Sequence, residues 1–579
     1  MLSQITQAPK NCRNWLFKDN LKIEATAKND PQPNIFFIFC IVFYGLYLVT
    51  IQPEWVLGGG MWAEMATNYY VNANNPSILV NLFSTDAGYI PLPQRIIAYI
   101  GSALNLPSTS IPYYYTWSGI LITGSMAGAF CLSPFRAIIR SDYLRLLSSI
   151  SILLVADFET RTFINFTYFS AFYIAIITAL ALVQKNEESP WWAWAIPVLI
   201  ISKPAVLSVF PAMILAALVS KARFRLITLS VALLCIVQVL NIYFSHSAGA
   251  FSPVYTFSTL EKIIAAGKFF IGLLGAFSAG KGISPEAYRP LWLGSFVFLS
   301  CLLIISKKRT NASALILVGL SMLFFNVLLN VFALSDSWNI KMENLIGIPF
   351  YRHIIVGYFG VVLVIVGLID TCAHLGKPGK SSFSLVMAPL IFILWFFLSG
   401  WFNFSAIINR APRSPVINNS QWQNMAPAIA SSESICIPID PLGWMFSKNC
   451  SQLNPNINVS TEIEYRPLQL KKEYFSIEIT PPTSASKKNL ISMAVLAQPS
   501  ISTALVQGEA VLTMKDGSIK YLSGSRQLAT SGGLLIFTNK GTTPLIDIES
   551  VILKFNAPIN IGFFSGEPGD HPAVLWMGN

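Results

Sequence analysis

Two acidic residues in the first third of the chain have the surroundings that a catalytic base needs. Glu64 lies in a stretch rich in Trp, Met and Tyr, and Asp86 lies two positions before Gly88. A carboxylate in a segment poor in water can accept the proton of a substrate hydroxyl. We rank Asp86 first because a substrate can approach closely beside glycine, Glu64 second and Glu54 a distant third. The alternative is that Glu64 belongs to an interfacial amphipathic helix and that Asp86 belongs to a plain turn.

Basic residues that could bind a phosphate stand at the ends of apolar segments. Lys203 lies between two apolar stretches so short that their hairpin barely reaches the surface, which places a compact positive charge near lipid headgroups. Arg352 and His353 open another helix, where arginine can grip a phosphate with two hydrogen bonds. For each residue the alternative is structural: a snorkelling lysine, an anchor in an aromatic belt, a local ion pair, or a loop charge solvated by water. The remaining predicted substrate-binding residues are Arg95, Asp157, Arg161 and Arg289.

The composition shows what kind of protein must position these residues. Hydrophobic residues make up 53% of the 579 positions and charged residues only 12%, about half of the roughly 25% that soluble domains carry. Almost all of the net charge of +11 lies before residue 405, at the ends of apolar runs. This distribution is typical of membrane topology, so it excludes a wholly soluble enzyme and a disordered chain. It also argues against nucleic acid as the partner.

The apolar runs predict a mainly α-helical, polytopic membrane protein with about eleven transmembrane helices. A transmembrane helix needs about 20 apolar residues, and fewer where neighbouring helices bury it. Residues 259–279 are also apolar, but we interpret them as an interfacial or re-entrant helix whose lysines Lys262 and Lys268 snorkel, since a further crossing would invert all that follows. The predicted crossings lie near residues 34–51, 112–132, 144–156, 162–183, 191–202, 204–220, 226–244, 288–306, 312–334, 350–370 and 383–404.

Basic residues indicate the orientation of these helices. Residues 1–33 are polar and basic and contain no apolar region of the kind found in a cleavable signal peptide. The positive-inside rule therefore places this N-terminal segment in the cytoplasm. Residues 34–404 form the predicted transmembrane domain, with a long first periplasmic loop at 52–111. An odd number of crossings leaves the remainder of the chain, residues 405–579, in the periplasm.

Residues 405–579 have a different pattern, which predicts an all-β sandwich or jelly roll. Apolar and polar residues alternate with the period of a β-strand, and Pro-Pro, Asp-Gly and Gly-Gly pairs separate the segments as turns do. The clearest strand segments are Glu462–Tyr465, Tyr474–Ile479, Ala510–Met514 and Val551–Phe555.

The eight cysteines divide between the predicted compartments. Only Cys436 and Cys450 fall in the exported domain, and an oxidising compartment favours a disulfide between them that closes a short loop around Trp444. The alternative is two reduced, buried thiols. The other cysteines lie in or beside apolar helices or in cytoplasmic segments. The four histidines are scattered, so no spacing of Cys and His suggests a metal site. We expect neither a metal nor a cofactor.

The first loop resembles part of a known family of membrane enzymes. The segment Trp62-Ala-Glu-Met resembles the Tyr-Ala-Glu-Ile segment that follows the first helix of lipid A aminoarabinose transferases, which belong to the GT-C superfamily of membrane glycosyltransferases. Asp86 to Arg95, before the next apolar segment, occupies the place of a second loop motif of that family. The family's Asp-Glu pair directly after the first helix is replaced here by Gly58-Gly-Gly60. Glu64 and Asp86 are therefore the substitutes for the family base.

The resemblance covers the topology of residues 34–404 and implies an activity. GT-C enzymes use polyprenyl-phosphate sugars and carry acidic catalytic residues in the first outer loop. The resemblance therefore implies an inverting, metal-independent glycosyltransferase at the periplasmic face of a bacterial inner membrane, with Asp86 or Glu64 as the base. Lys203, Arg289 and Arg352 would hold the departing lipid phosphate. The β domain would be similar to the sugar-binding domains that some of these enzymes append.

The expected partners are a polyprenyl-phosphate-linked monosaccharide as donor and a cell-surface glycan or O-antigen as acceptor. One alternative function is a polysaccharide polymerase or ligase, which would share the topology and the lipid chemistry. Another is a transporter or flippase of lipid-linked glycans. A transporter should carry ionisable residues at mid-membrane and paired broken helices, whereas the charges here stand at the rims of apolar runs. This difference favours the enzyme.

Reporter fusions test the predicted topology. Fusions after Arg309 and Lys380 should report the cytoplasm, and fusions after Asn339 and Asn419 the exterior, because basic residues are retained inside. Alkaline phosphatase and fluorescent-protein activities provide the measurement. A cytoplasmic signal after Asn419 would mean that residues 259–279 cross the membrane, and it would contradict the predicted location of every site residue downstream.

Overall fold

The computed structural model falls into two compact units. The described residues are 32–86, 88–156, 158–184, 187–244, 258–279, 288–308, 310–333, 351–373, 381–400, 420–441, 444–453, 463–471, 474–482, 487–500, 504–528, 532–564 and 572–579. The first unit, called here the helical unit, comprises Met1–Ile51, Asn75–Ile100 and Tyr115–Ser414. The second, called the β unit, comprises Gln52–Asn74, Gly101–Tyr114 and Pro415–Asn579. The predicted loop 52–111 is thus divided between the units, which differs from the predicted domain boundaries.

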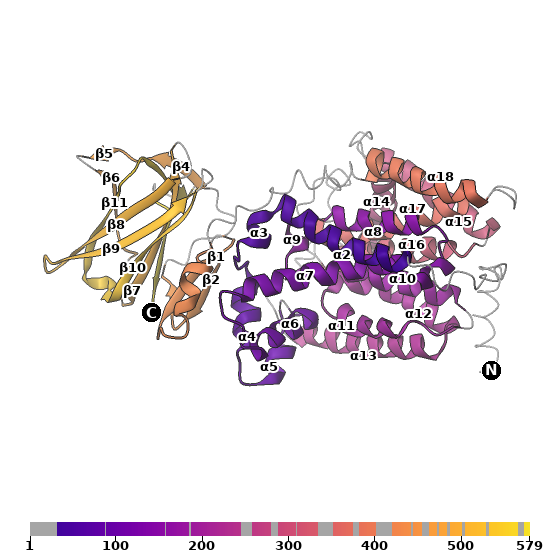
Figure 1. The fold of residues 1–579 in the computed structure, drawn as a ribbon, viewed down its shortest axis with the longest axis horizontal. Coiled ribbons are helices and arrows are strands. Elements are labelled where there is room, and N and C mark those ends of the chain that lie inside the picture. The colour runs from indigo at the N-terminus through magenta and orange to yellow at the C-terminus, as the bar shows by residue number, and fades with distance from the viewer. Residues whose placement is uncertain are drawn as a thin grey trace. The chain divides into compact units, whose positions relative to one another are not determined.

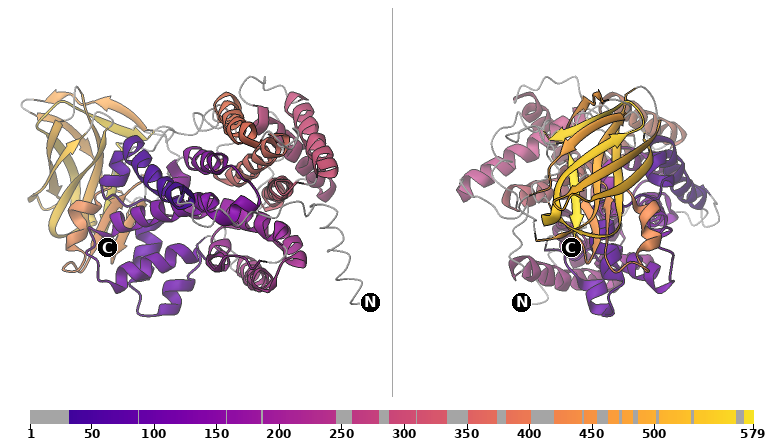
Figure 2. Two further views of the ribbon diagram at one scale, coloured as in Figure 1. Left: turned by 45° about the vertical axis from the view of Figure 1, so that its right-hand side comes forward. Right: turned by 90° about the vertical axis from the view of Figure 1, so that its left-hand side faces the viewer.

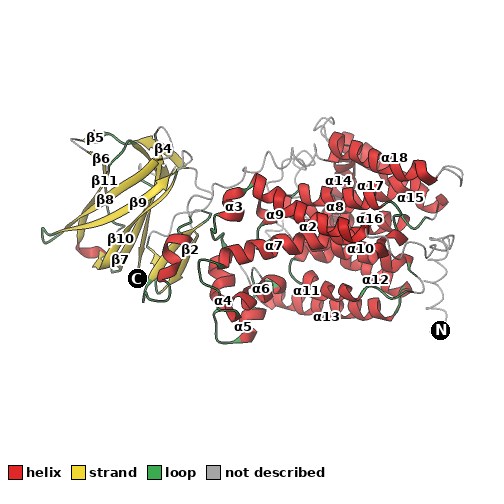
Figure 3. Cartoon of the chain, in the orientation of Figure 1, coloured by secondary structure: helices red, strands yellow, loops and turns green. Residues whose placement is uncertain are grey.

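Helices account for the regular structure of the helical unit (Figures 1 and 3). Their order follows the apolar runs of the sequence, interrupted at prolines and polar residues. In chain order the elements are α2 (Gln32–Ile51), α5 (Ile78–Phe83), α6 (Leu92–Ala103), α7 (Ile111–Gly128), η3 (Ala129–Cys131), η4 (Ser133–Ala137), α8 (Asp142–Leu154), α9 (Phe158–Arg161), η5 (Phe166–Phe169), α10 (Ser170–Val183), η6 (Trp191–Ala195), α11 (Ile196–Ile200), η7 (Pro204–Val209), α12 (Phe210–Val219), α13 (Ala222–Phe244), α14 (Thr259–Ala279), α15 (Tyr288–Lys308), α16 (Ser313–Ala333), α17 (Tyr351–Ala373), α18 (Ser381–Trp395) and η10 (Phe396–Gly400).

Among the described residues, eight helices are long and apolar enough to cross a membrane. The predicted count of eleven is therefore not confirmed, although a multi-pass helical protein is. The predicted crossing at 144–156 is a helix of 13 residues, and those at 191–202, 204–220 and 383–404 contain only shorter apolar helices. The eight segments are Pro33–Ile51, Ile111–Ala137, Phe166–Val183, Ala222–Asn241, Thr259–Ala279, Arg289–Lys307, Ser313–Phe332 and Ile354–Ala373.

Helix α14 covers the segment that we interpreted as interfacial or re-entrant. It is a continuous helix of 21 residues that packs against α15 and α16 within the bundle (Figure 1). Lys262 is buried, so the expected snorkelling is wrong for this residue, whereas Lys268 is exposed. The structure therefore favours a helix packed in the bundle over one lying at an interface.

Two glycines explain how closely α14 and α15 approach. A Cβ atom on Gly275 would lie 2.0 Å from the carbonyl oxygen of Pro290, and one on Gly294 would lie 1.8 Å from that of Ile271. No side chain fits at either position, and small residues are what allow helix backbones to pack this closely in membranes. The contact pairs early residues of one helix with late residues of the other, so the two helices run antiparallel.

A cluster of charges holds the beginning of α8. Arg136 donates through Nε to Oδ1 of Asp142 at 2.9 Å, and Arg145 also donates to Asp142. Arg145 reaches back to the carbonyl oxygen of Leu132 at 2.7 Å and that of Cys131 at 3.1 Å. These are carbonyls at the end of a helical turn, which need donors. Arg145 is fully buried, so it is a structural residue of the bundle and not a solvated loop charge.

The β unit contains one hydrogen-bonded sheet of eleven strands and a two-stranded hairpin, counted over the described residues. Every pairing is antiparallel, and the main path runs β3-β13-β7-β10-β9-β8-β11-β6-β5, with β12 joined to β4 and β7. The strands are β1 (Ile435–Ile439), β2 (Trp444–Lys448), β3 (Ser451–Gln452), β4 (Ile463–Pro467), β5 (Leu470–Lys471), β6 (Tyr474–Ile479), β7 (Asn489–Pro499), β8 (Ala504–Met514), β9 (Ile519–Leu528), β10 (Gly533–Pro544), β11 (Ile548–Phe555), β12 (Ile559–Phe564) and β13 (Val574–Gly578). Short helices accompany them: α3 (Pro53–Leu57), η2 (Met65–Tyr70), α4 (Val71–Ala73), α20 (Trp422–Met425), η11 (Ala426–Ala428) and η13 (Leu545–Asp547).

All four predicted strand segments lie in or overlap observed strands, namely β4, β6, β8 and β11. Figure 2 shows the sheet curving so that strands lie on both sides of a core. This C-terminal region is β-rich, but the structure does not confirm a jelly roll. The predicted Asp-Gly turn joins β8 to β9, where Gly517 has a φ of +85° and the carboxylate of Asp516 accepts a hydrogen bond from the backbone N–H of Ser518 at 2.9 Å.

Two hydrophobic clusters hold the β unit together. The main core lies on one face of the sheet and includes Leu512, Phe537 and Trp576. On the other face, Leu496 and neighbouring residues of β7, β10 and β13 pack against Cys436 of β1. Each fully buried apolar side chain stabilises the fold by about 1.5–3 kcal/mol relative to an exposed one. Strand β7 is therefore covered on both faces, by the core and by the hairpin β1–β2.

A disulfide between Cys436 and Cys450 ties the hairpin, with Cα atoms 5.6 Å apart. The loop that it closes spans 14 positions and contains Trp444, as expected from the sequence. The chain-entropy model assigns such a loop about 3 kcal/mol of stabilisation. The bond is therefore a substantial part of what holds β1–β2 in place.

Mass spectrometry of a non-reduced digest should yield one peptide species that joins Cys436 to Cys450. Replacing both by serine should lower the free energy of unfolding of the β unit by about 3 kcal/mol, measured by chemical denaturation of the full chain. Alkylation of both thiols in the untreated protein would contradict the pairing.

Candidate functional site

Asp86 and Tyr89 close a tight turn before helix α6. The backbone N–H of Asp86 donates to the carbonyl oxygen of Tyr89 at 2.7 Å, and that of Tyr89 donates back to Asp86 at 3.0 Å. Gly88 has a φ of +83°, in the left-handed region that glycine adopts without strain. The glycine near the acid, which the sequence analysis singled out, is therefore required by the turn. The Asp86 side chain is half-buried.

Lys203 is the second element of the site. Its backbone is extended, with φ −148° and ψ 132°, because the following proline disfavours a helical conformation at this position. The ammonium group donates a hydrogen bond to the hydroxyl of Tyr89. It lies 4.5 Å from the ring centroid of Tyr89 and 5.8 Å from that of Tyr168. Only 5% of Lys203 is exposed, so these partners offset the cost of burying its charge.

Amide side chains hold the turn from two other segments. On α13, Gln238 donates to the carbonyl oxygen of Gly88 and accepts from the N–H of Ile90, both at 3.4 Å. At the start of α6, Gln94 donates to the carbonyl oxygen of Ile164 at 2.8 Å. Both glutamines are buried. The turn that carries Asp86 is thus fixed by α13 on one side and by the chain before η5 on the other.

Arg161 is held separately from this cluster. Its guanidinium donates to the hydroxyl of Tyr47 at 3.3 Å and to the carbonyl oxygen of Leu154 at 3.2 Å. The guanidinium carbon lies 5.2 Å from the ring centroid of Tyr47. These contacts tie α2 to the end of α8, and the predicted role of Arg161 in substrate binding stays a prediction.

The remaining predicted substrate-binding residues differ in exposure. Arg95 on α6 is only 1% exposed, whereas Arg289 is exposed in the first turn of α15. Arg352 and His353 lie in the first turn of α17, and their side chains are outside the described part of the structure, as is all of Asp157. Hydrogen bonds link two of the predicted site residues, Asp86 and Lys203, through Tyr89.

Glu64 belongs to the β unit, whereas Asp86 belongs to the helical unit. The backbone before Glu64 pairs with the C-terminal region: the N–H of Asp440 donates to the carbonyl oxygen of Met61 at 3.3 Å, and the N–H of Ala63 donates to that of Asp440. Glu64 then begins the π-helical turn η2 and is half-buried. Its segment is therefore held by the β unit, and the two candidate bases are positioned by different parts of the chain.

Gly59 allows the same segment of the first loop to pack against the C-terminal part of the β unit. Its carbonyl oxygen accepts a hydrogen bond from the side-chain amide of Gln423 at 2.7 Å. The residue has a φ of +64°, and a Cβ atom there would lie 2.3 Å from that amide and 2.5 Å from the ring of Tyr113. Next to it, the indole N–H of Trp422 donates to the carbonyl oxygen of Ser108 at 2.8 Å. Gly59 of the Gly-Gly-Gly segment thus allows close packing at the place where the resembled family has its acidic pair.

Four residues of the site were not singled out from the sequence: Tyr89, Gln94, Tyr168 and Gln238. Gln238 carried a usable signal, since it is a lone amide inside an apolar run, where polar groups are expensive and tend to be functional. The two tyrosines carried none, because aromatic residues are frequent throughout this chain, at 13% of its residues.

No family model matches the sequence, and no similar protein was found among curated proteins or solved structures. The resemblance to GT-C enzymes accordingly rests on the topology and the first-loop motifs.

Replacing Tyr89 by Phe should destabilise the protein by about 1–3 kcal/mol, because a buried ammonium loses a hydrogen-bond partner. Thermal unfolding of the full chain in lipid nanodiscs measures the effect. Tyr99→Phe is a matched control on α6, since the Tyr99 hydroxyl forms no hydrogen bond with any described residue. Equal melting temperatures for the two variants would show that the contact with Lys203 is not structural.

Proposed function

We propose that this protein transfers a monosaccharide from a polyprenyl-phosphate donor to a hydroxyl group of a cell-surface glycan, with Asp86 as the base. One observation carries the proposal: the turn of Asp86 is linked through Tyr89 to the buried ammonium of Lys203. The reaction needs a carboxylate that accepts a proton and a positive charge that stabilises the departing phosphate, each held in place. The apolar helices of the same unit suit a lipid-linked substrate.

The proposed reaction divides the work between the two charges. The carboxylate of Asp86 accepts the proton of the acceptor hydroxyl, whose oxygen then attacks the anomeric carbon. The bond between that carbon and the phosphate oxygen breaks, and the lipid phosphate leaves with the electron pair. Attack and departure occur on opposite faces of the sugar, so the configuration inverts. Positive side chains stabilise the departing phosphate.

Lys203 acts in this scheme mainly as a positioning residue. Its hydrogen bond fixes Tyr89, and the backbone hydrogen bonds of Tyr89 fix Asp86. Its charge also makes the surroundings of the turn favourable for an anion. Arg289, Arg352 and His353 are the further candidates for direct contact with phosphate, because each stands at the beginning of an apolar helix. The reaction is proposed for the periplasmic face of a bacterial inner membrane, with the β unit in the periplasm.

Substitution of the two acids tests the proposal. Asp86→Asn keeps the size of the side chain but removes a strong proton acceptor, so it should lower transfer by roughly 10²–10⁴-fold. Glu64→Gln should have a smaller effect, because Asp86 is the proposed base and Glu64 is only the second candidate. Transfer of labelled sugar from a synthetic polyprenyl-phosphate monosaccharide by the purified full chain is the assay.

Two further variants separate binding from proton transfer. Arg352→Ala should weaken binding of the polyprenyl-phosphate donor, and Lys203→Ala should weaken donor binding and lower transfer together. Asp86→Asn should leave donor binding unchanged. Melting temperatures of all variants control for misfolding. Full transfer by both acid variants would refute the role of this loop and would direct attention to Asp157 and Glu159.

A further inference from the structure

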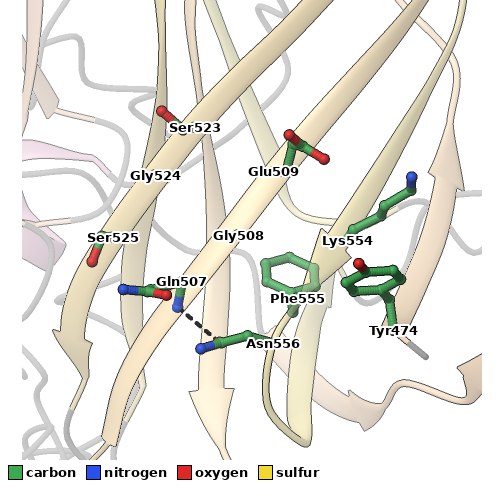
Figure 4. Close-up of a pocket in the computed structure, with 10 residues that line it drawn as sticks. All are labelled: Tyr474, Gln507, Gly508, Glu509, Ser523, Gly524, Ser525, Lys554, Phe555 and Asn556. Atoms are coloured by element: carbon green, nitrogen blue, oxygen red, sulfur yellow. Dashed lines mark hydrogen bonds between the residues drawn. The ribbon is translucent and has the colours of Figure 1, made fainter.

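The outward face of the β unit carries a concavity that the proposed reaction does not use. Figure 4 shows it between the strands β6, β8, β9 and β11. Its volume is about 440 Å³, within the roughly 300–1,000 Å³ of small-molecule sites. The side chains that matter for its chemistry are Tyr474, Gln507, Glu509, Ser523, Lys554 and Asn556.

An acid, a base and an aromatic ring stand together in this concavity. Glu509 of β8 and Lys554 of β11 are directly opposite each other in the antiparallel ladder, and both side chains point to the same face (Figure 4). The ammonium of Lys554 lies 5.7 Å from the ring centroid of Tyr474. Tyr474 is 48% exposed, so its ring forms a wall that a ligand can contact.

The polar side chains at the rim of the concavity are held in place and can still form hydrogen bonds with a ligand. The side-chain oxygen of Asn556 accepts a hydrogen bond from the backbone N–H of Gln507 at 3.0 Å, which fixes the amide and directs its nitrogen away from that bond. Among the described residues, the carboxylate of Glu509 and the amide nitrogen of Asn556 have no hydrogen-bond partner. The site therefore offers a strong acceptor and oriented donors.

Two glycines form the floor. Gly508 and Gly524 are paired across β8 and β9. A Cβ atom on Gly508 would lie 3.0 Å from the rings of Phe537 and Phe555, and one on Gly524 would lie 2.3 Å from the carbonyl oxygen of Ile536. Because glycine has no side chain, both strands lie close against the core here, and the outer surface of the sheet is depressed at this point. The hollow is thus built into the backbone, which makes it a preformed site.

We propose that this concavity binds a neutral saccharide unit. Acid and base cancel, so the lining carries no net charge, and it interleaves donors with acceptors as neighbouring hydroxyl groups require. The apolar face of a sugar ring can pack on Tyr474, as ligand sites combine an aromatic surface with a few placed polar groups. An anionic ligand would meet the carboxylate of Glu509. The inference does not depend on the proposed transfer reaction, because binding can be measured without it.

The test uses the full chain in lipid nanodiscs, since alkyl-glycoside detergents present sugars themselves. Saturation-transfer difference NMR measures binding of the methyl glycosides of glucose, galactose, mannose and N-acetylglucosamine, with methyl glucuronide as an anionic comparison. We expect binding of at least one neutral glycoside. Tyr474→Ala and Glu509→Gln should weaken it by roughly tenfold or more, because each removes a main contact of the ligand.

Matched controls lie in the same sheet outside the concavity. Tyr521→Ala on β9 removes a tyrosine that is 63% exposed, and Glu549→Gln on β11 alters an exposed glutamate; both should leave binding unchanged. Three results would overturn the proposal: no binding of any neutral glycoside, binding of the glucuronide alone, or equal losses in control and concavity variants. Unchanged melting temperatures establish that the variants fold.

Discussion

A buried positive charge organises the helical unit around the candidate site. The ammonium of Lys203 is almost completely removed from solvent, and an ion in such a place needs partners close by. The partners are the hydroxyl and ring of Tyr89 and the ring of Tyr168. These partners lie after α5 and in η5, and Lys203 itself lies before η7, so the three segments must meet. The turn of Asp86 is one of the segments that this requirement fixes.

The β unit depends on a different constraint, the close packing of neighbouring atoms against the backbone of glycines. Gly59 leaves room for the amide of Gln423, and the paired Gly508 and Gly524 let two strands lie directly on the core. In both places a single Cβ atom would collide with its neighbours. Glycine therefore has two uses in this unit: it lets the first-loop segment dock, and it hollows the outward face of the sheet.

Local features of the sequence predicted individual helices, strands and turns better than the contacts between residues distant in sequence. Tyr474–Ile479 was predicted as a strand because alternation is a local signal, and the turn at Asp86 followed from the nearby glycine. Lys203 was expected near lipid headgroups, and the structure shows that it is buried within the protein. This burial was not predicted, because its tyrosine partners are distant in sequence and no local pattern indicates them. Several predicted crossings proved shorter, since prolines and polar residues such as Ser202 interrupt the apolar runs. The residues that join Asp86 to Lys203 became visible only with the fold.

The docking of the first-loop segment also sets an order of events during synthesis. Gly59 and Gln423 are 364 positions apart, and at about 5–20 residues per second a ribosome needs roughly 20–70 s to make the intervening chain. Throughout that time the carbonyl oxygens of Gly59 and Met61 lack the partners that they have in the folded protein. The segment therefore cannot form these hydrogen bonds while the helices that follow it are made and inserted. The last third of the chain completes a structure that the first hundred residues began.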